Sequence, residues 1–254
     1  MDPSQPSPTG KAQPADQQES LADGYARILH LAGGLAHEIK NPLSTIGLNM
    51  ELLAEDLAQA ETPRERRARG RIEVVQKECR RLQRLLDDFL NFAKVRPGKL
   101  EPTDLNETVE EVLDFIGPSA EQAHIEVIRY LDPNLPRVML DREAFHGALL
   151  NLLINAQQAM PDGGELMVRT TTAGPLVALY LVDTGCGMDE RTASRMFEEF
   201  FSTKPGGSGL GLPTTAKIIA AHGGRISVES ELGHGTKFTV ELPALPRLAG
   251  SGEG

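Results

Sequence analysis

The sequence has no tryptophan, and only 4% of its 254 residues are aromatic. Leu, Ile, Val, Ala and Met must therefore build most of any hydrophobic core. Two cysteines are too few for a disulfide framework and favour a reducing compartment. No apolar run approaches the roughly 18 residues of a membrane-spanning helix, and the first residues do not begin a signal peptide. We therefore expect a cytoplasmic protein with no membrane insertion.

Positive charge is also in short supply. The chain holds 26 Lys and Arg against 36 Asp and Glu, which gives a net charge of −10. Because binding to nucleic acid needs clustered cations that neutralise phosphates, nucleic acid is not an expected partner. The remaining composition, 40% hydrophobic and 24% charged, is that of a globular protein, and the length allows one large domain or two small ones.

The first part of the chain predicts an antiparallel helical hairpin. Residues 1–20 hold four Pro and four Gln and are typical of a disordered tail. Residues 21–96 carry two heptad-like apolar series, separated by Thr62-Pro63-Arg64-Glu65, which offers an N-cap, a first-turn proline and a capping-box acid. Since each helix can bury only one stripe, we expect a homodimer that forms a four-helix bundle. The two series are Leu21, Tyr25, Ile28, Ala32, Leu35, Ile39, Pro42, Ile46 and Ile72, Val75, Cys79, Leu82, Leu86, Phe89, Ala93.

The second part of the chain has a different pattern. Residues 97–103 are expected to be a linker, because Pro97 and Gly98 break the helix. Over 104–243 strands and helices alternate, which predicts an α+β sandwich: a mixed sheet with helices on one face. Residues 244–254 should be a flexible tail. The expected helices are Asp104–Phe115, Arg142–Met160 and Pro213–His222, and the expected strands are Ile125–Leu131, Val138–Leu140, Leu166–Thr170, Leu176–Val182, Arg225–Glu229 and Thr236–Glu241.

One segment of the first helix carries polar residues off the apolar seam. Leu35–Leu43 reads LAHEIKNPL, and His37 lies between two seam positions, so it should point outward, where a large partner can reach it. An unperturbed imidazole, with a pKa of about 6.5, is largely neutral and nucleophilic at pH 7. Asn41 lies one turn further on the same face, and Pro42 predicts a kink just after His37. Taken alone, a single outward histidine is more often an incidental surface residue.

Three segments of the second part suit a nucleotide. Asn151 and Asn155 share one helix face, where amide oxygens could bind Mg²⁺, although a plain polar helix edge looks the same. Asp183 ends a strand before two glycines, where a buried carboxylate could accept from an exocyclic amine; a tight turn explains it equally well. The glycine-rich run Gly206–Leu212 precedes a helix, whose first N–H groups can bind phosphate.

In this order, the segments resemble the sensor histidine protein kinases of bacterial two-component systems, over roughly residues 21–243. The resemblance implies a dimerising phosphoacceptor hairpin followed by a Bergerat-type ATP-binding domain. Leu35–Leu43 resembles the H box in its nitrogen-regulation form, Asn151–Ala159 the N box, Asp183–Gly187 the first glycine box, Phe197–Lys204 the F box and Gly207–Gly211 the second glycine box.

The resemblance also implies cofactors, a partner and residue roles. The cofactors are ATP and Mg²⁺, and the partner is the receiver domain of a response regulator. His37 would accept the γ-phosphoryl group, and Glu38 would assist as acid or base. Asn155 would coordinate Mg²⁺ with help from Asn151, and Asp183 would bind the adenine amine. The other residues implied to flank the nucleotide are Gly185, Gly187, Gly207, Gly209, Leu210, Gly211 and Thr236.

One position departs from the family pattern. Many relatives carry a basic residue where this chain has Gln158, so Lys204 becomes the expected contact to the γ-phosphate. We expect an ATP-dependent autokinase that passes phosphate from His37 to an aspartate of the receiver.

Two other functions remain open. The spacing of Glu38 and Asn41 resembles the family's phosphatase element, so the chain could act chiefly as a receiver phosphatase with nucleotide as a conformational ligand. A non-catalytic scaffold is the remaining class. No sensor domain is visible in the polar N-terminal residues. The signal is therefore expected from an upstream sensor protein, unless the chain is a fragment of a longer one.

Overall fold

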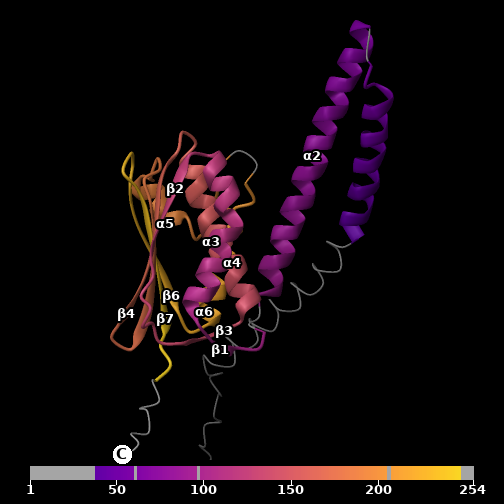
Figure 1. The fold of residues 1–254 in the computed structure, drawn as a ribbon. Helices are drawn as coiled ribbons and strands as arrows, with labels where there is room; N and C mark the ends of the chain where they lie inside the picture. The colour runs from indigo at the N-terminus through magenta and orange to yellow at the C-terminus, as the bar shows by residue number, and fades with distance from the viewer. Residues whose placement is uncertain (1–37, 60–61, 96–97, 205–206, 247–254) are drawn as a thin grey trace, which may run out of the picture. The chain divides into compact units, whose positions relative to one another are not determined.

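The computed structural model describes residues 38–59, 62–95, 98–204 and 207–246. The chain divides into two compact units, residues 1–94 and 95–254, which are drawn as ribbons in Figure 1 and are treated separately below. The expected phosphoacceptor His37 and the expected N-terminal tail, residues 1–20, lie outside the described residues. Within the described ranges, no helix is both long enough and apolar enough to cross a membrane.

The first unit is the predicted helical hairpin. Residues 38–56 form its first helix, and α2 (Pro63–Lys94) forms its second. The predicted capping box at the start of α2 is confirmed. The Thr62 N–H donates to the Glu65 carboxylate at 2.9 Å, and the Glu65 N–H donates to the Thr62 hydroxyl at 3.2 Å. These two bonds satisfy backbone donors that a helix start otherwise leaves unpaired.

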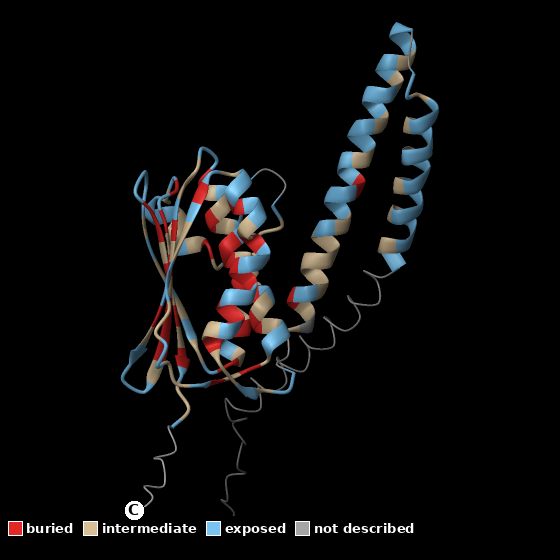
Figure 2. Cartoon of the chain, in the orientation of Figure 1, coloured by how far each residue is buried: buried red, intermediate tan, exposed pale blue. Residues whose placement is uncertain are grey.

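Polar side-chain contacts join the two hairpin helices, but many of their large apolar side chains are exposed. Lys40 pairs with Asp87 at 2.6 Å, and the Gln83 amide donates to the Ser44 hydroxyl at 3.3 Å. Both pairs join early residues of the first helix to late residues of α2, as an antiparallel hairpin requires. Figure 2 shows the helices largely exposed. The exposed large apolar residues are Ile39, Ile46, Leu48, Leu52, Leu53, Val74, Val75 and Leu82.

The second unit is the expected α+β sandwich. Its main sheet has the strand order β2-β4-β5-β7-β6, in which β2 runs parallel to β4 and the other pairs are antiparallel. Three helices, α3, α4 and α6, lie on one face of this sheet (Figure 1). The elements are β1 (Glu101–Thr103), α3 (Leu105–Gln122), β2 (Ile125–Tyr130), β3 (Val138–Leu140), α4 (Arg142–Ala159), β4 (Gly164–Ala173), β5 (Leu176–Asp183), α5 (Glu190–Arg195), α6 (Gly211–Ala221), β6 (Arg225–Glu231) and β7 (Gly235–Pro243).

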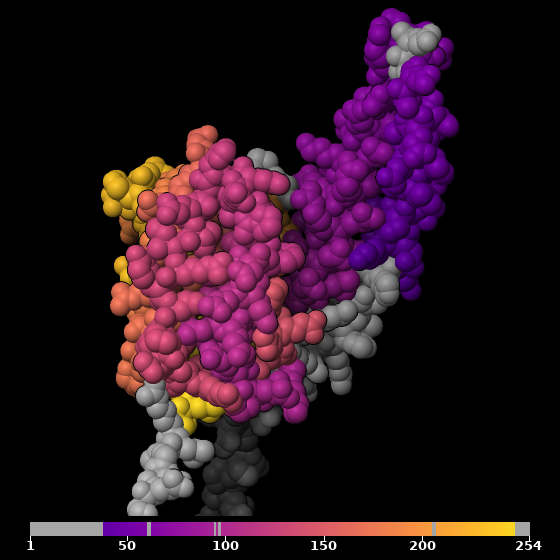
Figure 3. All heavy atoms as spheres, in the orientation of Figure 1, coloured from indigo at the N-terminus to yellow at the C-terminus, as the bar shows by residue number. Residues whose placement is uncertain are grey.

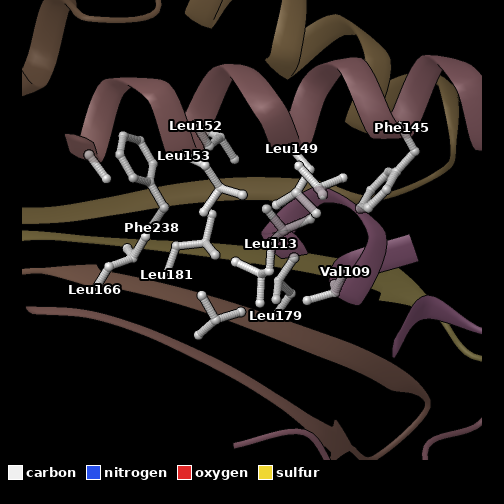
Figure 4. Close-up of a cluster of buried hydrophobic side chains, with 14 of the residues drawn as sticks. Val109, Leu113, Phe145, Leu149, Leu152, Leu153, Leu166, Leu179, Leu181 and Phe238 are labelled. Carbon is white, nitrogen blue, oxygen red and sulfur yellow. The ribbon is translucent and has the colours of Figure 1, made fainter. Parts of the chain in front are cut away.

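The core of this unit lies between α4 and the sheet. Four side chains of α4 face four side chains of the strands in Figure 4, and all eight are buried. In the space-filling view the helices and the sheet close on each other, so the gaps between ribbons are filled with side chains (Figure 3). Truncating one such leucine to alanine typically costs about 2–5 kcal/mol of folding free energy. The facing residues are Phe145, Leu149, Leu152 and Leu153 of α4 with Leu166, Leu179, Leu181 and Phe238 of the sheet.

The structure differs from the sequence-based expectation at three places. Helix α3 continues past its predicted end at Phe115 to Gln122, although Pro118 lies inside it. Pro118 removes one helical hydrogen bond, but Ile116 and Ala120 keep the apolar stripe buried on both sides of it. Part of the expected linker forms β1, which pairs antiparallel with β3. Helix α5 was not expected.

The start of the expected C-terminal tail also belongs to the fold. The Ala244 N–H donates to the Pro175 carbonyl at 2.9 Å, and the Leu245 N–H donates to the Arg137 carbonyl at 2.8 Å. These bonds continue the pairing of β7 by two residues, because the backbone of the neighbouring segments offers acceptors there.

Asp141 joins three segments of the second unit. Its carboxylate caps α4 by accepting from the Ala144 N–H at 3.0 Å, and it also accepts from the Gly98 N–H at 2.8 Å. Its own N–H donates to Nε2 of the buried His222, just after α6, at 2.9 Å. The N–H donors, the Ala144 bond foremost, hold the pKa of Asp141 below its usual value. Asp141 therefore ties the chain before β1 to α4 and to the end of α6.

We expect Asp141→Ala to destabilise the protein by more than Asp189→Ala. Both variants remove an N-cap, worth about 1 kcal/mol, but Asp189 caps only the short α5. Because the pKa of Asp141 is lowered, its contribution is present at pH 7 and is lost as the pH falls through that lowered pKa. Urea unfolding at pH 7 and at pH 4 measures both effects. Equal losses for the two variants at pH 7 would contradict the three-way role of Asp141.

Candidate functional site

Helix α4 presents a row of amide side chains beside its buried face. Asn151, Asn155 and Gln158 follow one another at helical spacing, and both asparagines are half-buried. The Asn151 amide donates to the Thr215 hydroxyl of α6 at 2.9 Å. Its oxygen lies against Gly211, where an added Cβ would come within 2.7 Å of that oxygen. Gly211 therefore lets the first turn of α6 approach the row of amides.

Asp183 is a buried carboxylate at the end of β5, with 3% of its surface exposed. It accepts from the Gly185 N–H at 2.9 Å and from the backbone N–H of Thr236, its neighbour on β7. Burial raises the pKa of Asp183 above its usual value, although the two N–H groups oppose that shift. A carboxylate in this position retains unused acceptor capacity for a ligand.

The loop after β5 brings Asp183 to the C-terminal end of α4. The Cys186 N–H donates to the Ala159 carbonyl, in the last turn of α4, at 2.9 Å. Gly187 has a φ of +62°, and a Cβ there would lie 1.9 Å from the Glu231 carbonyl oxygen. Only glycine fits such a conformation and such an approach. Gly187, which was predicted to flank the nucleotide, thus also determines the course of this loop.

The predicted F box reaches back to the same helix. The Lys204 ammonium donates to the Asn155 amide oxygen at 2.7 Å and to the Gln158 amide oxygen at 2.6 Å. Partial burial lowers the pKa of Lys204. Phe200, earlier in the F box, is exposed and holds a left-handed φ of 64°, and its N–H donates to the Gly209 carbonyl at 3.0 Å. Phe200 and Gly209 hold the two predicted boxes together.

The second glycine box ends at the start of α6. Leu210 is buried, and its N–H donates to the Ser208 hydroxyl at 3.3 Å. No side chain caps α6, whose first residue is Gly211. The first N–H groups of a helix point outward and favour an anion, above all where no side chain takes them. Gly207 precedes this start, and its N–H donates to the Lys204 carbonyl at 3.1 Å.

The predicted residues of the hairpin lie in the other unit. Glu38 and Asn41 are exposed on the helix of residues 38–56, which continues through Pro42. The Thr45 hydroxyl donates to the backbone carbonyl of Asn41 at 3.2 Å. This bond does not involve the side-chain amide of Asn41. His37 precedes the described range, so its exposure and the kink expected after it stay predictions.

The oxygen donors of the site are amides and one carboxylate. Within the described ranges, no group of three or more His, Cys, Asp or Glu side chains is arranged to hold a metal ion. Amide oxygens are hard donors that suit Mg²⁺ when phosphates and water complete its shell. A hollow of about 590 Å³ lies by the β4–β5 turn, at the far end of β5 from Asp183, and includes none of the predicted site residues.

Comparison with protein families decides what this chain is related to. Residues 28–98 match the His Kinase A (phospho-acceptor) domain, and residues 140–246 match the histidine kinase-, DNA gyrase B- and HSP90-like ATPase. The chain belongs to the sensor histidine kinase family. The resemblance inferred from the sequence motifs is thereby confirmed, and the motifs that carry it lie within the matched ranges.

Curated relatives of this histidine kinase are longer proteins. The chain is 34% identical over 227 residues to the signal transduction histidine-protein kinase AtoS of Escherichia coli, covering 89% of this chain and 36% of AtoS. It is 32% identical to the sensory histidine kinase/phosphatase NtrB of Rhodobacter capsulatus, covering 90% of this chain and 66% of NtrB. The chain thus spans between about a third and two thirds of these relatives.

Solved histidine kinase structures share its fold. Full-length ShkA in complex with AMPPNP matches with a TM-score of 0.66 at 27% identity, over 85% of this chain and 46% of ShkA. ThkA in complex with the response regulator protein TrrA matches with a TM-score of 0.62 at 27% identity, over 91% of this chain and 64% of ThkA. Both matches include the hairpin and the sandwich.

Two contacts of the site were not expected from the sequence. Thr215, which accepts the Asn151 amide bond, is buried to 1% exposure, and Gln158 shares the Lys204 ammonium with Asn155. Thr215 stands four residues after Gly211 in a helix that is otherwise apolar on its buried side. In the sequence, a threonine four residues after Gly211 in an otherwise apolar helix is the one signal that could have pointed to this contact.

We expect the Asp183→Asn variant to become more stable relative to wild type as the pH rises. The pKa of Asp183 is raised by burial, so its ionisation opposes folding above its usual pKa, and stability is lost as the pH rises through the raised value. Asparagine keeps an acceptor oxygen without the charge. In melting curves between pH 4 and pH 8, the melting temperature of the variant should rise relative to that of wild type as the pH increases.

Asp189→Asn is the control for that experiment. Asp189 caps α5, and its pKa is lowered by hydrogen bonds to Thr192. The stability of this variant relative to wild type should therefore fall as the pH rises, which is the opposite trend. An Asp183→Asn protein that is less stable than wild type by the same margin at every pH would identify Asp183 as a turn former alone.

Proposed function

We propose that this chain is an ATP-dependent protein-histidine kinase. It transfers the γ-phosphoryl group of ATP to His37 and then to an aspartate of a response regulator. The observation that carries the proposal is the gathering of Asn155, Asp183 and Lys204 at one end of α4, beside the uncapped start of α6. The names of the relatives support it, as do the solved relatives with AMPPNP and with a response regulator.

The base of ATP is assigned to Asp183. Its carboxylate accepts a hydrogen bond from the exocyclic amine of adenine, and Gly185 and Gly187 let the flat ring approach the backbone. Thr236 keeps its N–H on the carboxylate, which orients the free lone pairs toward the ligand. Burial makes this interaction strong, because no water competes for the acceptor.

Mg²⁺ and the phosphates are assigned to the amide row and to α6. The Asn155 oxygen would hold the ion with help from Asn151, and its observed bond to a cationic group shows that the oxygen faces a position suited to positive charge. When bound, the ion neutralises charge on the phosphates. The N–H groups of Gly209 and Gly211 cradle the phosphates, Gly207 and Leu210 flank them, and Lys204 reaches the γ-phosphate.

The transfer step uses the hairpin. A ring nitrogen of His37 forms a bond to the γ-phosphorus while the bond from that phosphorus to the ADP oxygen breaks, and Glu38 takes the proton that the ring gives up. Glu38 is exposed and adjacent to His37 in sequence. The phosphoryl group then passes to a receiver carboxylate as the bond to the ring nitrogen breaks. Such reactions need mainly positioning and charge neutralisation.

Dephosphorylation of the receiver is the second candidate function. Asn41 is exposed three residues after Glu38, so its carboxamide is free to orient a water molecule against a phosphorylated receiver. NtrB, one relative, is named a kinase/phosphatase. In a predominantly phosphatase protein, nucleotide would serve as a conformational ligand.

The assembly is proposed to be a homodimer in the cytoplasm. Pairing of two hairpins would cover the exposed apolar residues of 38–56 and α2, which a single hairpin leaves in water. The chain spans only part of its relatives, so a sensor is proposed to act upstream, in the same or another protein. The cytoplasmic location is a prediction from the low cysteine content.

We expect His37→Gln to abolish labelling by γ-labelled ATP while nucleotide affinity stays within a few-fold of wild type, because His37 lies in a unit that holds no predicted nucleotide residue. The label on wild type should be acid-labile, as phosphohistidine is. Asn41→Ala is the matched variant on the same helix: it should keep the label and lose dephosphorylation of the receiver. Acid-labile label that persists in His37→Gln would exclude His37 as the acceptor.

We expect Asp183→Asn to lower ATP affinity by about ten- to a hundredfold, the loss of one charge-assisted hydrogen bond. GTP carries a carbonyl where ATP carries the amine, so wild type should prefer ATP strongly and the variant much less. Competition against a fluorescent nucleotide measures both affinities. An unchanged ratio of ATP to GTP affinity in a folded variant would refute the adenine assignment.

A further inference from the structure

The Lys204 ammonium is held by neutral oxygens alone. Its two bonds, 2.7 Å to Asn155 and 2.6 Å to Gln158, run to amide oxygens on one side of α4. Among the described residues, no carboxylate forms an ion pair with Lys204. A cation held by two amide oxygens occupies the kind of position in which a metal ion is bound.

The Asn155 oxygen is the shared element. An amide oxygen has two lone pairs, but an ammonium and a divalent ion on the same oxygen would lie only a few ångströms apart. Two cations at that separation repel each other even near the protein surface. Occupation of this oxygen by one cation therefore opposes occupation by the other.

We propose that the Lys204 ammonium and Mg²⁺ compete for the Asn155 amide oxygen, so that binding of the metal with nucleotide displaces Lys204 from α4. This inference rests on the proposed function and extends it to regulation of the same site. Gln158 is a positioning residue in this arrangement, because it supplies the second bond that keeps Lys204 on Asn155. Displacement releases the ammonium toward the phosphates, and the F box moves with it.

The competition predicts a measurable cost in metal affinity. ADP is the suitable probe, because it lacks the γ-phosphate that Lys204 would gain with ATP. The Mg²⁺ concentration needed for half-maximal binding of a fluorescent ADP analogue should fall by about ten- to a hundredfold in Lys204→Met, the range for losing the one charge-assisted hydrogen bond to Asn155. Methionine keeps the length of the side chain without its charge.

Two further variants separate competition from a general effect of charge. Gln158→Met removes one bond to the ammonium without changing any charge, and it should also lower the Mg²⁺ midpoint. Lys237→Met removes one positive charge from a residue paired with Glu229 on the neighbouring strand β6, and it should leave the midpoint at the wild-type value.

The outcomes distinguish this inference from the proposed function. A wild-type midpoint in Lys204→Met, or a wild-type midpoint in Gln158→Met, would overturn the competition even though nucleotide still binds. Failure of the wild-type protein to bind ADP at any Mg²⁺ concentration would instead overturn the proposed function. A fall in both variants, with no change in Lys237→Met, supports the competition.

Discussion

The packing of α4 on the sheet is the constraint on which the site depends. Leu149, Leu152 and Leu153 must face the strands, and this fixes the rotation of the helix about its axis. Asn151 and Asn155 are then half-buried beside that face, with Asn151 bonded to α6, and Gln158 lies exposed near the end of α4. The binding geometry is thus a by-product of hydrophobic burial, which a helix with a different apolar stripe could not reproduce.

The same constraint explains where the molecule tolerates unfavourable local features. A buried carboxylate at Asp183, a left-handed Phe200 and an uncapped α6 each cost stability in isolation. The loop after Asp183 is bonded to the end of α4 through Cys186, the Phe200 segment is bonded to Gly209, and α6 is joined to α4 by the Asn151 amide. The well-packed elements therefore compensate for the polar end of the domain, and function is concentrated where local rules are broken.

Much of the architecture was predictable because it rests on local signals. The capping box at Thr62, the β-rich run of β5 and the apolar spacing of α4 each appear within a few neighbouring residues. The continuation of α3 through Pro118 was not predictable from the chain around it, because burial of Ile116 and Ala120 against distant strands outweighs one missing hydrogen bond. The contact of Lys204 with Asn155 and Gln158 was not predicted for a similar reason, since it joins residues 49 and 46 positions apart in the chain.

The two cysteines differ in accessibility, and this has a practical consequence. Cys79 is buried on α2, whereas Cys186 is exposed in the loop that follows Asp183, near Lys204. A thiol reagent applied to the folded protein should therefore react at a single position. A fluorophore or spin label would be placed in the natural sequence beside the proposed nucleotide site, with no engineered cysteine required.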